Sequence, residues 1–114
     1  MLLLVDDDEL FRGALAANLR EDGFEVREYA SGEAVPIGQL QGVQLVLTDY
    51  MMDKEDGLTF AQRFHRAHPE VPVIVITAFA TAHLESAVEA SDYLTLLHKP
   101  LDYEELLARL PPPG

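Results

Sequence analysis

Five short apolar runs, separated by stretches with helical spacing, constrain the fold of this chain more than any other feature. The runs occupy residues 2–5, 24–26, 43–48, 73–77 and 94–97. Strands that alternate with helices are typical of βαβ units, in which right-handed crossovers join parallel strands. The third run is nearly unbroken, as expected of a strand covered on both faces, whereas the second alternates apolar and polar residues like an edge strand. The pattern therefore predicts a parallel sheet.

The stretches between the runs predict the helices. Apolar residues recur at helical spacing in 10–19, 58–65, 81–90 and 102–110. Gly23 ends the first pattern, and the pair His68-Pro69 ends the second. Ser31 is a good N-cap for a further helix, but Pro36 would clash with the carbonyl of Gly32, so we expect a short or distorted helix there. The fold class is thus α/β: a flavodoxin-like (βα)5 three-layer sandwich with strand order 2-1-3-4-5.

Composition narrows the classes of function. A chain of 114 residues predicts one domain, which we place at residues 1–110, with the Pro-rich residues 111–114 as the start of a linker or a C-terminal tail. The absence of cysteine excludes disulfides and thiolate chemistry. A net charge of -12 argues against direct contact with nucleic acid. No apolar run is long enough to span a bilayer, and the first residues do not resemble a signal peptide, so we expect a cytoplasmic location without membrane contact.

Acidic, hydroxyl or basic side chains lie at the ends of four of the five runs. The first run ends in three aspartates, 6–8, and the third ends in Asp49, which opens an acidic loop containing Gly57. The fourth ends in Thr77, and the fifth is followed by Lys99. The carboxyl ends of parallel strands converge on one crevice in a doubly wound sheet. We therefore expect these side chains to share one acidic pocket.

The residue types indicate phosphoryl chemistry in that pocket. Carboxylates from two loops offer the oxygen ligands that Mg²⁺ prefers. Two like charges about 4 Å apart repel by roughly 4 kcal/mol near a protein surface, so clustered carboxylates favour a divalent cation. Lys99 can pair with Asp49 or a phosphate oxygen, and the Thr77 hydroxyl can donate to another. Asp49 would then be the nucleophile and would form an acyl phosphate.

In this order the motifs VDDD, DYMMDKEDG, ITAFA and KP resemble the receiver domains of two-component response regulators, over nearly the whole chain. The stretch ITAFAT is most similar to receivers of enhancer-binding transcriptional activators. The resemblance implies a phosphorelay switch in transcription regulation. It makes Asp49 the phosphoacceptor, Thr77 the switch hydroxyl and Lys99 the phosphate-binding lysine.

The resemblance also implies the metal ligands and the partners. Mg²⁺ or Mn²⁺ would be bound by Asp7, Asp49 and the backbone carbonyl of Met51, with Asp6 acting through water. A sensor histidine kinase or a phosphotransfer protein would supply the phosphoryl group. The surface formed by residues 81–90, 94–97 and 102–110 would change on phosphorylation, and it is also the candidate homodimer face. A downstream output domain is implied as well.

Three features depart from the family pattern. Asp53 stands where proline is common, and Glu55 stands where a small or apolar residue is common, so the loop is unusually acidic. Leu96 occupies the usual position of the switch aromatic residue, and the nearest aromatic residue is Tyr93. The usual Gly-Ala before the fifth strand is missing.

Two other functions stay open at this point. The first is a pseudo-receiver that binds proteins without phosphorylation, which the departures favour and the retained Asp7, Asp49 and Lys99 disfavour. The second is a Mg²⁺-dependent aspartyl phosphohydrolase, but Met51 occupies the position where those enzymes carry a second aspartate. We expect no enzyme activity beyond self-phosphorylation and self-dephosphorylation at Asp49.

Overall fold

The computed structural model describes residues 1–113, which form one five-stranded parallel sheet with order β2-β1-β3-β4-β5. The strands are β1 (Leu2–Val5), β2 (Val26–Tyr29), β3 (Leu45–Asp49), β4 (Val73–Thr77) and β5 (Leu94–His98). The helices are α1 (Glu9–Glu21), α2 (Gly57–Ala67), α3 (Ala82–Glu89) and α4 (Tyr103–Leu107), with a short 3₁₀ helix η1 (Ile37–Gln39). The predicted fold class and strand order are confirmed.

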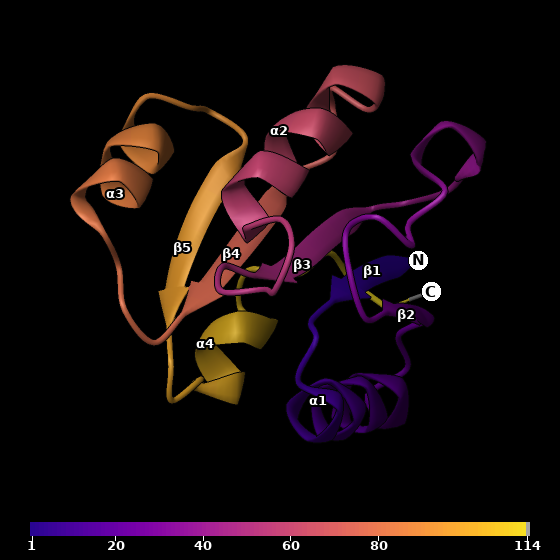
Figure 1. Cartoon of the computed structure of the whole chain (residues 1–114). Coiled ribbons are helices and arrows are strands. Elements are labelled where there is room, and N and C mark those ends of the chain that lie inside the picture. Colours follow the sequence, from indigo (N-terminus) through magenta and orange to yellow (C-terminus); the bar gives the residue numbers. More distant parts are fainter. Residues whose placement is uncertain (114) are drawn as a thin grey trace.

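Helices cover both faces of the sheet and produce three layers. Figure 1 shows α2 and α3 on one side of the strands and α1 and α4 on the other. Because side chains alternate across a strand, β1 contributes Leu3 and Val5 to one core and Leu2 and Leu4 to the other. β1, β3 and β4 are buried along their whole length, as expected of central strands with both faces covered.

The second strand begins later than the sequence indicates. Gly23 adopts a φ of 94°, its N–H donates to the Arg20 carbonyl, and the N–H of Phe24 donates to the Leu19 carbonyl. This pair of bonds is a Schellman motif that ends α1, and a buried apolar residue after the glycine commonly accompanies it. Phe24 is therefore buried as part of the helix end, and pairing with β1 starts at Val26.

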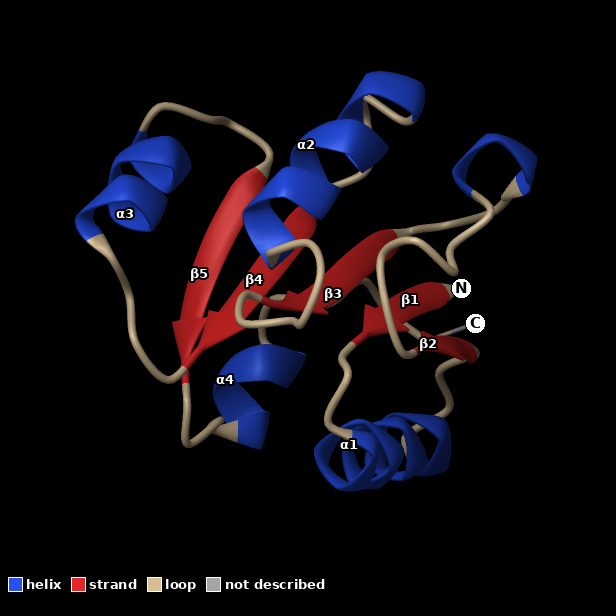
Figure 2. Cartoon of the chain, in the orientation of Figure 1, coloured by secondary structure: helices blue, strands red, loops and turns tan. Residues whose placement is uncertain are grey.

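The segment from 31 to 40 forms less helix than any other predicted stretch. Figure 2 shows that the connection from β2 to β3 is mostly loop. Its only regular element is η1, which starts directly after Pro36. A proline is tolerated at the start of a helix but not inside it, so the expected distortion takes the form of one 3₁₀ turn.

Side-chain caps set the starts of all four α-helices. Asp8, Asp56, Thr81 and Asp102 each accept a hydrogen bond from a backbone N–H in the first turn of the helix that follows. Such caps satisfy amides that have no partner within the helix. α4 ends at Leu107, short of the predicted residue 110, ahead of the prolines from 111. No helix among residues 1–113 is long and apolar enough to cross a membrane.

The predicted linker or tail lies only partly within the described residues. Residue 114 lies outside them. Residues 111–113 have no helix or strand assignment, in keeping with a run of prolines.

Candidate functional site

Main-chain hydrogen bonds align the carboxyl ends of the central strands. The N–H of Tyr50 donates to the Ile76 carbonyl at 2.9 Å, and the N–H of Lys99 donates to the Thr77 carbonyl at 2.8 Å. The strand ladders therefore continue beyond β3 and β5. As a result, Asp49 and Lys99 lie at the same edge of the sheet, as the sequence predicted.

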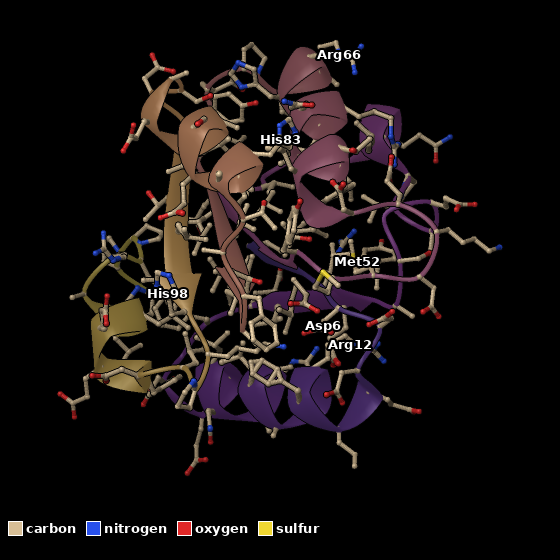
Figure 3. The ribbon with its side chains drawn as sticks, turned by 60° about the vertical axis from the view of Figure 1, so that its left-hand side comes forward. Asp6, Arg12, Met52, Arg66, His83 and His98 are labelled. Atoms are coloured by element: carbon tan, nitrogen blue, oxygen red, sulfur yellow. The ribbon has the colours of Figure 1, made fainter. Side chains whose placement is uncertain are left out.

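Three aspartates meet at this edge. Carboxylate oxygens of Asp6, Asp7 and Asp49 all lie within 4.8 Å of one another. Asp6 is 2% exposed and Asp49 is 7% exposed, whereas Asp7 is open to solvent. Figure 3 shows Asp6 at the edge of the sheet, above α1. Two buried acids and one exposed acid thus form a cluster, called the acidic pocket below, in which Asp7 faces solvent.

Burial changes the acidity of the two inner carboxyl groups. It raises the pKa of Asp6 to about 6, with the charge of Asp49 adding to the increase. Burial also raises the pKa of Asp49, although Lys99 opposes that change. Both carboxylates therefore carry their charge at a free-energy cost in the metal-free protein. A cation in the pocket would relieve that cost.

Lys99 is the cationic side chain of the pocket. Its ammonium lies 3.4 Å from Asp49 Oδ1 and 3.8 Å from Asp6 Oδ2. It also lies 4.3 Å from the centre of the Phe11 ring, an arrangement in which the ring face attracts a cation. The Lys99–Pro100 peptide bond is cis. One ammonium faces three carboxylates, so the pocket keeps an excess of negative charge.

The donor set fits Mg²⁺ or Mn²⁺. All three side chains offer hard oxygen ligands, which these ions prefer. Ligands on opposite sides of Mg²⁺ are about 4.2 Å apart, comparable with the spacing of the aspartate oxygens. Within the described residues, no hydrogen bond engages the Met51 carbonyl, two residues after β3, so that oxygen is available as a further ligand. Its role as a ligand stays a prediction.

The turn after β1 is held by its own aspartates. The N–H of Asp8 donates to Asp6 Oδ1 at 2.9 Å, and the Asp8 carboxylate caps α1 through the N–H of Phe11. Across the pocket, the N–H of Asp53 donates to Asp7 Oδ2 at 3.1 Å. Asp8 therefore has the capping role that its position in a first turn indicates. Asp53 joins the two loops through its main chain.

Gly57 lets α2 begin directly against the end of β3. A Cβ at this position would lie 2.1 Å from the Asp49 carbonyl oxygen and 3.0 Å from the Tyr50 Cα. The N–H of Gly57 donates to the Tyr50 carbonyl at 2.8 Å. Only glycine permits so close an approach of two backbones. The glycine of the acidic loop is therefore part of the support beneath Asp49.

Thr77 is fully buried, and its hydroxyl is directed to its own loop. The hydroxyl donates to the Phe79 carbonyl at 3.0 Å and accepts from the Phe79 N–H at 3.1 Å. The structure thus brings Thr77 to the correct edge of the sheet but gives its hydroxyl main-chain partners. A role as switch hydroxyl would need these two bonds to change.

Of the two residues considered for the switch aromatic position, Leu96 has the position without a ring, and Tyr93 has the ring at another position. Leu96 pairs with Val75, two residues before the end of β4. The carbonyl of Tyr93 accepts from the N–H of Val73, at the opposite end of β4 from Thr77. The Tyr93 ring stacks on His65, with ring centres 3.6 Å apart. Tyr93 cannot take the place of the usual aromatic residue.

The acidic loop has an anchor of its own. Glu55 accepts two hydrogen bonds from Arg63 of α2, at 2.7 and 3.1 Å. A cavity of about 170 Å³ lies beside the pocket, and its lining includes Asp7, Met52, Asp53 and Glu55. The sequence offered no reason to single out Arg63, because its partner is eight residues away and outside the helix. The sequence likewise offered no reason to single out Arg12, which donates to the main-chain carbonyl of Asp6.

Comparison with protein families and curated proteins gives consistent matches. Residues 2–111 match the response regulator receiver domain. The chain is 33% identical over 120 residues to the DNA-binding dual master transcriptional regulator RpaA of Synechocystis sp., covering 96% of this chain and 46% of RpaA. It is 37% identical over 112 residues to the transcriptional regulatory protein ZraR of Escherichia coli, covering 96% of this chain and 25% of ZraR. The chain thus spans half or less of these relatives.

A solved structure agrees with these matches. It is the crystal structure of a response regulator protein from Burkholderia pseudomallei with a phosphorylated aspartic acid, a calcium ion and citrate. The two are 27% identical, with a TM-score of 0.81 over 96% of this chain and 65% of the other. The resemblance drawn from the sequence is confirmed, since the family match covers nearly every residue: this chain belongs to the response regulator receiver domains.

Proposed function

We propose that this receiver domain is a phosphoacceptor switch that takes a phosphoryl group onto Asp49 from a histidine kinase or a phosphotransfer protein. The observation that carries the proposal is the pocket of Asp6, Asp7 and Asp49, with Lys99 3.4 Å from the proposed nucleophile. A phosphorylated aspartic acid and a calcium ion are present in the Burkholderia relative. The family membership and this pocket support the same chemistry.

In the proposed reaction, a carboxylate oxygen of Asp49 attacks the phosphorus of a phosphohistidine. An O–P bond forms as the N–P bond breaks, and the histidine nitrogen that leaves takes up a proton. Lys99 would pair with the phosphoryl oxygens. Asp7, Asp49 and the Met51 carbonyl would hold Mg²⁺, with Asp6 acting through water, and the ion would supply positive charge to offset that of the phosphoryl group. Small phosphodonors and water would support self-phosphorylation and self-dephosphorylation by the same route.

The output side of the proposal concerns the surface formed by α3, β5 and α4. Phosphorylation shifts a conformational equilibrium only by its different interactions with the two states. The Thr77 hydroxyl bonds the main chain of Phe79, in the loop that leads to α3. A new bond from this hydroxyl to the phosphoryl group would break that contact and alter the loop before the helix. This surface is the proposed dimer face. The longer relatives support an output domain beyond this chain.

Composition supports two further parts of the proposal, the cell compartment and the lack of direct DNA contact by this domain. A cysteine-free chain is compatible with a reducing compartment, and we propose the cytoplasm. With a net charge of -12, the domain itself would not contact DNA.

The test is the binding of beryllofluoride, a phosphoryl mimic, in the presence of Mg²⁺. The wild-type chain should bind it, with shifts in the NMR amide signals of Tyr50 and Phe79, and Asp49→Asn should not. Asp92→Asn removes the same charge from an exposed residue outside the pocket, and it should behave as wild type. Equal binding by wild type and Asp49→Asn would overturn the phosphoacceptor assignment.

One observation favours a second function, a pseudo-receiver that binds partners without phosphorylation. Leu96 has the usual strand position but no aromatic ring, and the Tyr93 ring stacks on His65 instead. The two functions differ in a measurable way. A switch changes its α3–β5–α4 amide signals when beryllofluoride binds, whereas a pseudo-receiver leaves them unchanged.

A further inference from the structure

We propose that Arg12 is a positioning residue that orients the acidic pair for the cation; this rests on the proposed metal site. Its Nη1 donates to the main-chain carbonyl of Asp6 at 2.7 Å, and its Nε donates to Glu28 Oε1 at 3.2 Å. The side chain is largely buried although it is charged. Figure 3 shows Arg12 next to Asp6, at the top of α1.

The Asp6 carbonyl is a sensitive place for such a bond. It belongs to the peptide unit that joins Asp6 to Asp7, and a peptide unit is planar. Fixing its oxygen therefore restricts the backbone of both residues and the directions in which their carboxylates point. A hydrogen bond from a guanidinium is stronger than one from a neutral donor, and Glu28 holds the guanidinium from a second side.

The choice of acceptor also matters. Arg12 donates to a carbonyl oxygen rather than to the carboxylates of the pocket. It orders the acidic pair without competing with a cation for the ligand oxygens. Lys99, in contrast, lies against the carboxylates themselves. The two cations of this region thus have separate roles.

α1 supplies a matched control in Arg20. It also bonds Glu28, at 2.9 Å, and it also donates to a main-chain carbonyl, that of Val26, at 2.8 Å. Arg20 lies two turns further along the same helix, and these two bonds reach no residue of the pocket. Substitution of either arginine removes a tie between α1 and β2. Only substitution of Arg12 releases the peptide between Asp6 and Asp7.

The experiment is calorimetric titration of the whole chain with Mg²⁺, alongside urea unfolding. Loss of a residue that orients metal ligands typically weakens metal binding by 10–100-fold, so we expect about a tenfold higher Kd for Arg12→Gln. Arg20→Gln should bind as wild type. Arg12→Lys keeps the positive charge but has a single ammonium group in place of the forked guanidinium, so its Kd should lie between those of wild type and Arg12→Gln. In the metal-free protein, the amide proton of Asp8 should shift in Arg12→Gln and not in Arg20→Gln.

Equal Mg²⁺ affinity and equal Asp8 shifts in the two glutamine variants would overturn the inference and leave the metal site intact. Absence of Mg²⁺ binding by wild type would overturn the proposed metal site and this inference with it. If Arg12→Gln does not fold, the same comparison is made between Arg12→Lys and Arg20→Lys. In that case unchanged affinity in Arg12→Lys overturns the inference.

Discussion

The two loops that frame the acidic pocket are held in different ways. The turn between β1 and α1, residues 6–8, has three residues, and its bonds run to main-chain atoms or to its own aspartates. The loop between β3 and α2, residues 50–56, has seven residues and depends on an ion pair between Glu55 and Arg63. One bond, from the N–H of Asp53 to Asp7, joins the two loops.

This difference bears on one of the three departures from the family pattern, the acidic residues of the loop. All three residues of the turn lie close to an anchor, because Arg12 bonds the Asp6 carbonyl and the Asp8 N–H bonds the Asp6 carboxylate. The loop has main-chain bonds at its start and at its end, through Tyr50 and Gly57, while its middle depends on the pair of Glu55 and Arg63. Asp53 and Glu55, the unusual acidic residues, both lie in the loop and not in the turn. For the proposed metal site, we expect substitutions in the middle of this loop to alter metal affinity or partner choice.

The largest expected effect comes from removing the glycine that ends the loop. Gly57→Ala places a Cβ 2.1 Å from the Asp49 carbonyl oxygen, and neither backbone can yield easily. We expect the free energy of unfolding to fall by about 3 kcal/mol in urea denaturation. Gly13→Ala is the control, since its Cβ would meet no atom within 4 Å and it lies inside α1. That variant should gain about 0.5–1 kcal/mol. Similar effects at both glycines would show that the loop end is not tightly packed.

The second test concerns the turn and its response to pH. The folded protein keeps the proton on Asp6 up to about pH 6, whereas the unfolded chain loses it near its ordinary value of 3.8. The folded state therefore binds more protons between these values, and stability falls as pH rises through this range. Without metal, the free energy of unfolding should drop by about 2 kcal/mol from pH 4.5 to 7.5.

Asp6→Asn should make this fall smaller, because its side chain does not titrate, while Asp49, whose pKa burial also raises, still contributes. Mg²⁺ should restore stability of the wild type at pH 7.5, because it binds the folded state alone. A wild-type profile that rises between pH 4.5 and 7.5 in the absence of metal would contradict the assigned burial effect.

The smallest expected effect tests the anchor of the loop. Arg63→Gln removes two hydrogen bonds to Glu55 at a partly exposed position, so we expect a loss of about 0.5–1 kcal/mol that shrinks at high salt. The exposed pair Arg109 and Glu105, with a nitrogen–oxygen distance of 3.7 Å, is the control, and Arg109→Gln should lose about 0.3 kcal/mol or less. A salt-independent loss in Arg63→Gln would show that the guanidinium acts through packing, for example on Phe60.

Much of the fold could be predicted because its main determinants are local. Apolar runs in β1, β3 and β4 are short and uninterrupted, and capping residues such as Thr81 precede the helices. The start of β2 could not be predicted from its pattern, because Phe24 alternates like a strand residue while its N–H serves the end of α1. Pro36 correctly indicated a weak helix, but the form that it takes depends on the surrounding chain.

The candidate site also combines features that the sequence predicts with features that it does not. The positions of Asp49 and Lys99 followed from where their strands end, since parallel strands place those ends together. The hydroxyl direction of Thr77 and the contact of Arg12 with Asp6 depend on side-chain rotamers and on partners that no periodic pattern encodes. The aspartates could be predicted as a cluster, but their unequal exposure could be seen only once the strands were placed.

The hydroxyl of Thr77 has a consequence for how selective the domain can be. It is already engaged as both donor and acceptor with Phe79, so an incoming group must outcompete a satisfied pair of bonds. Ordinary anions in the surrounding buffer are poor competitors, because the nearby carboxylates repel them. In the proposed switch, only a phosphoryl group held covalently at Asp49 would have the local concentration to displace these two bonds, and free anions would leave the resting form unchanged.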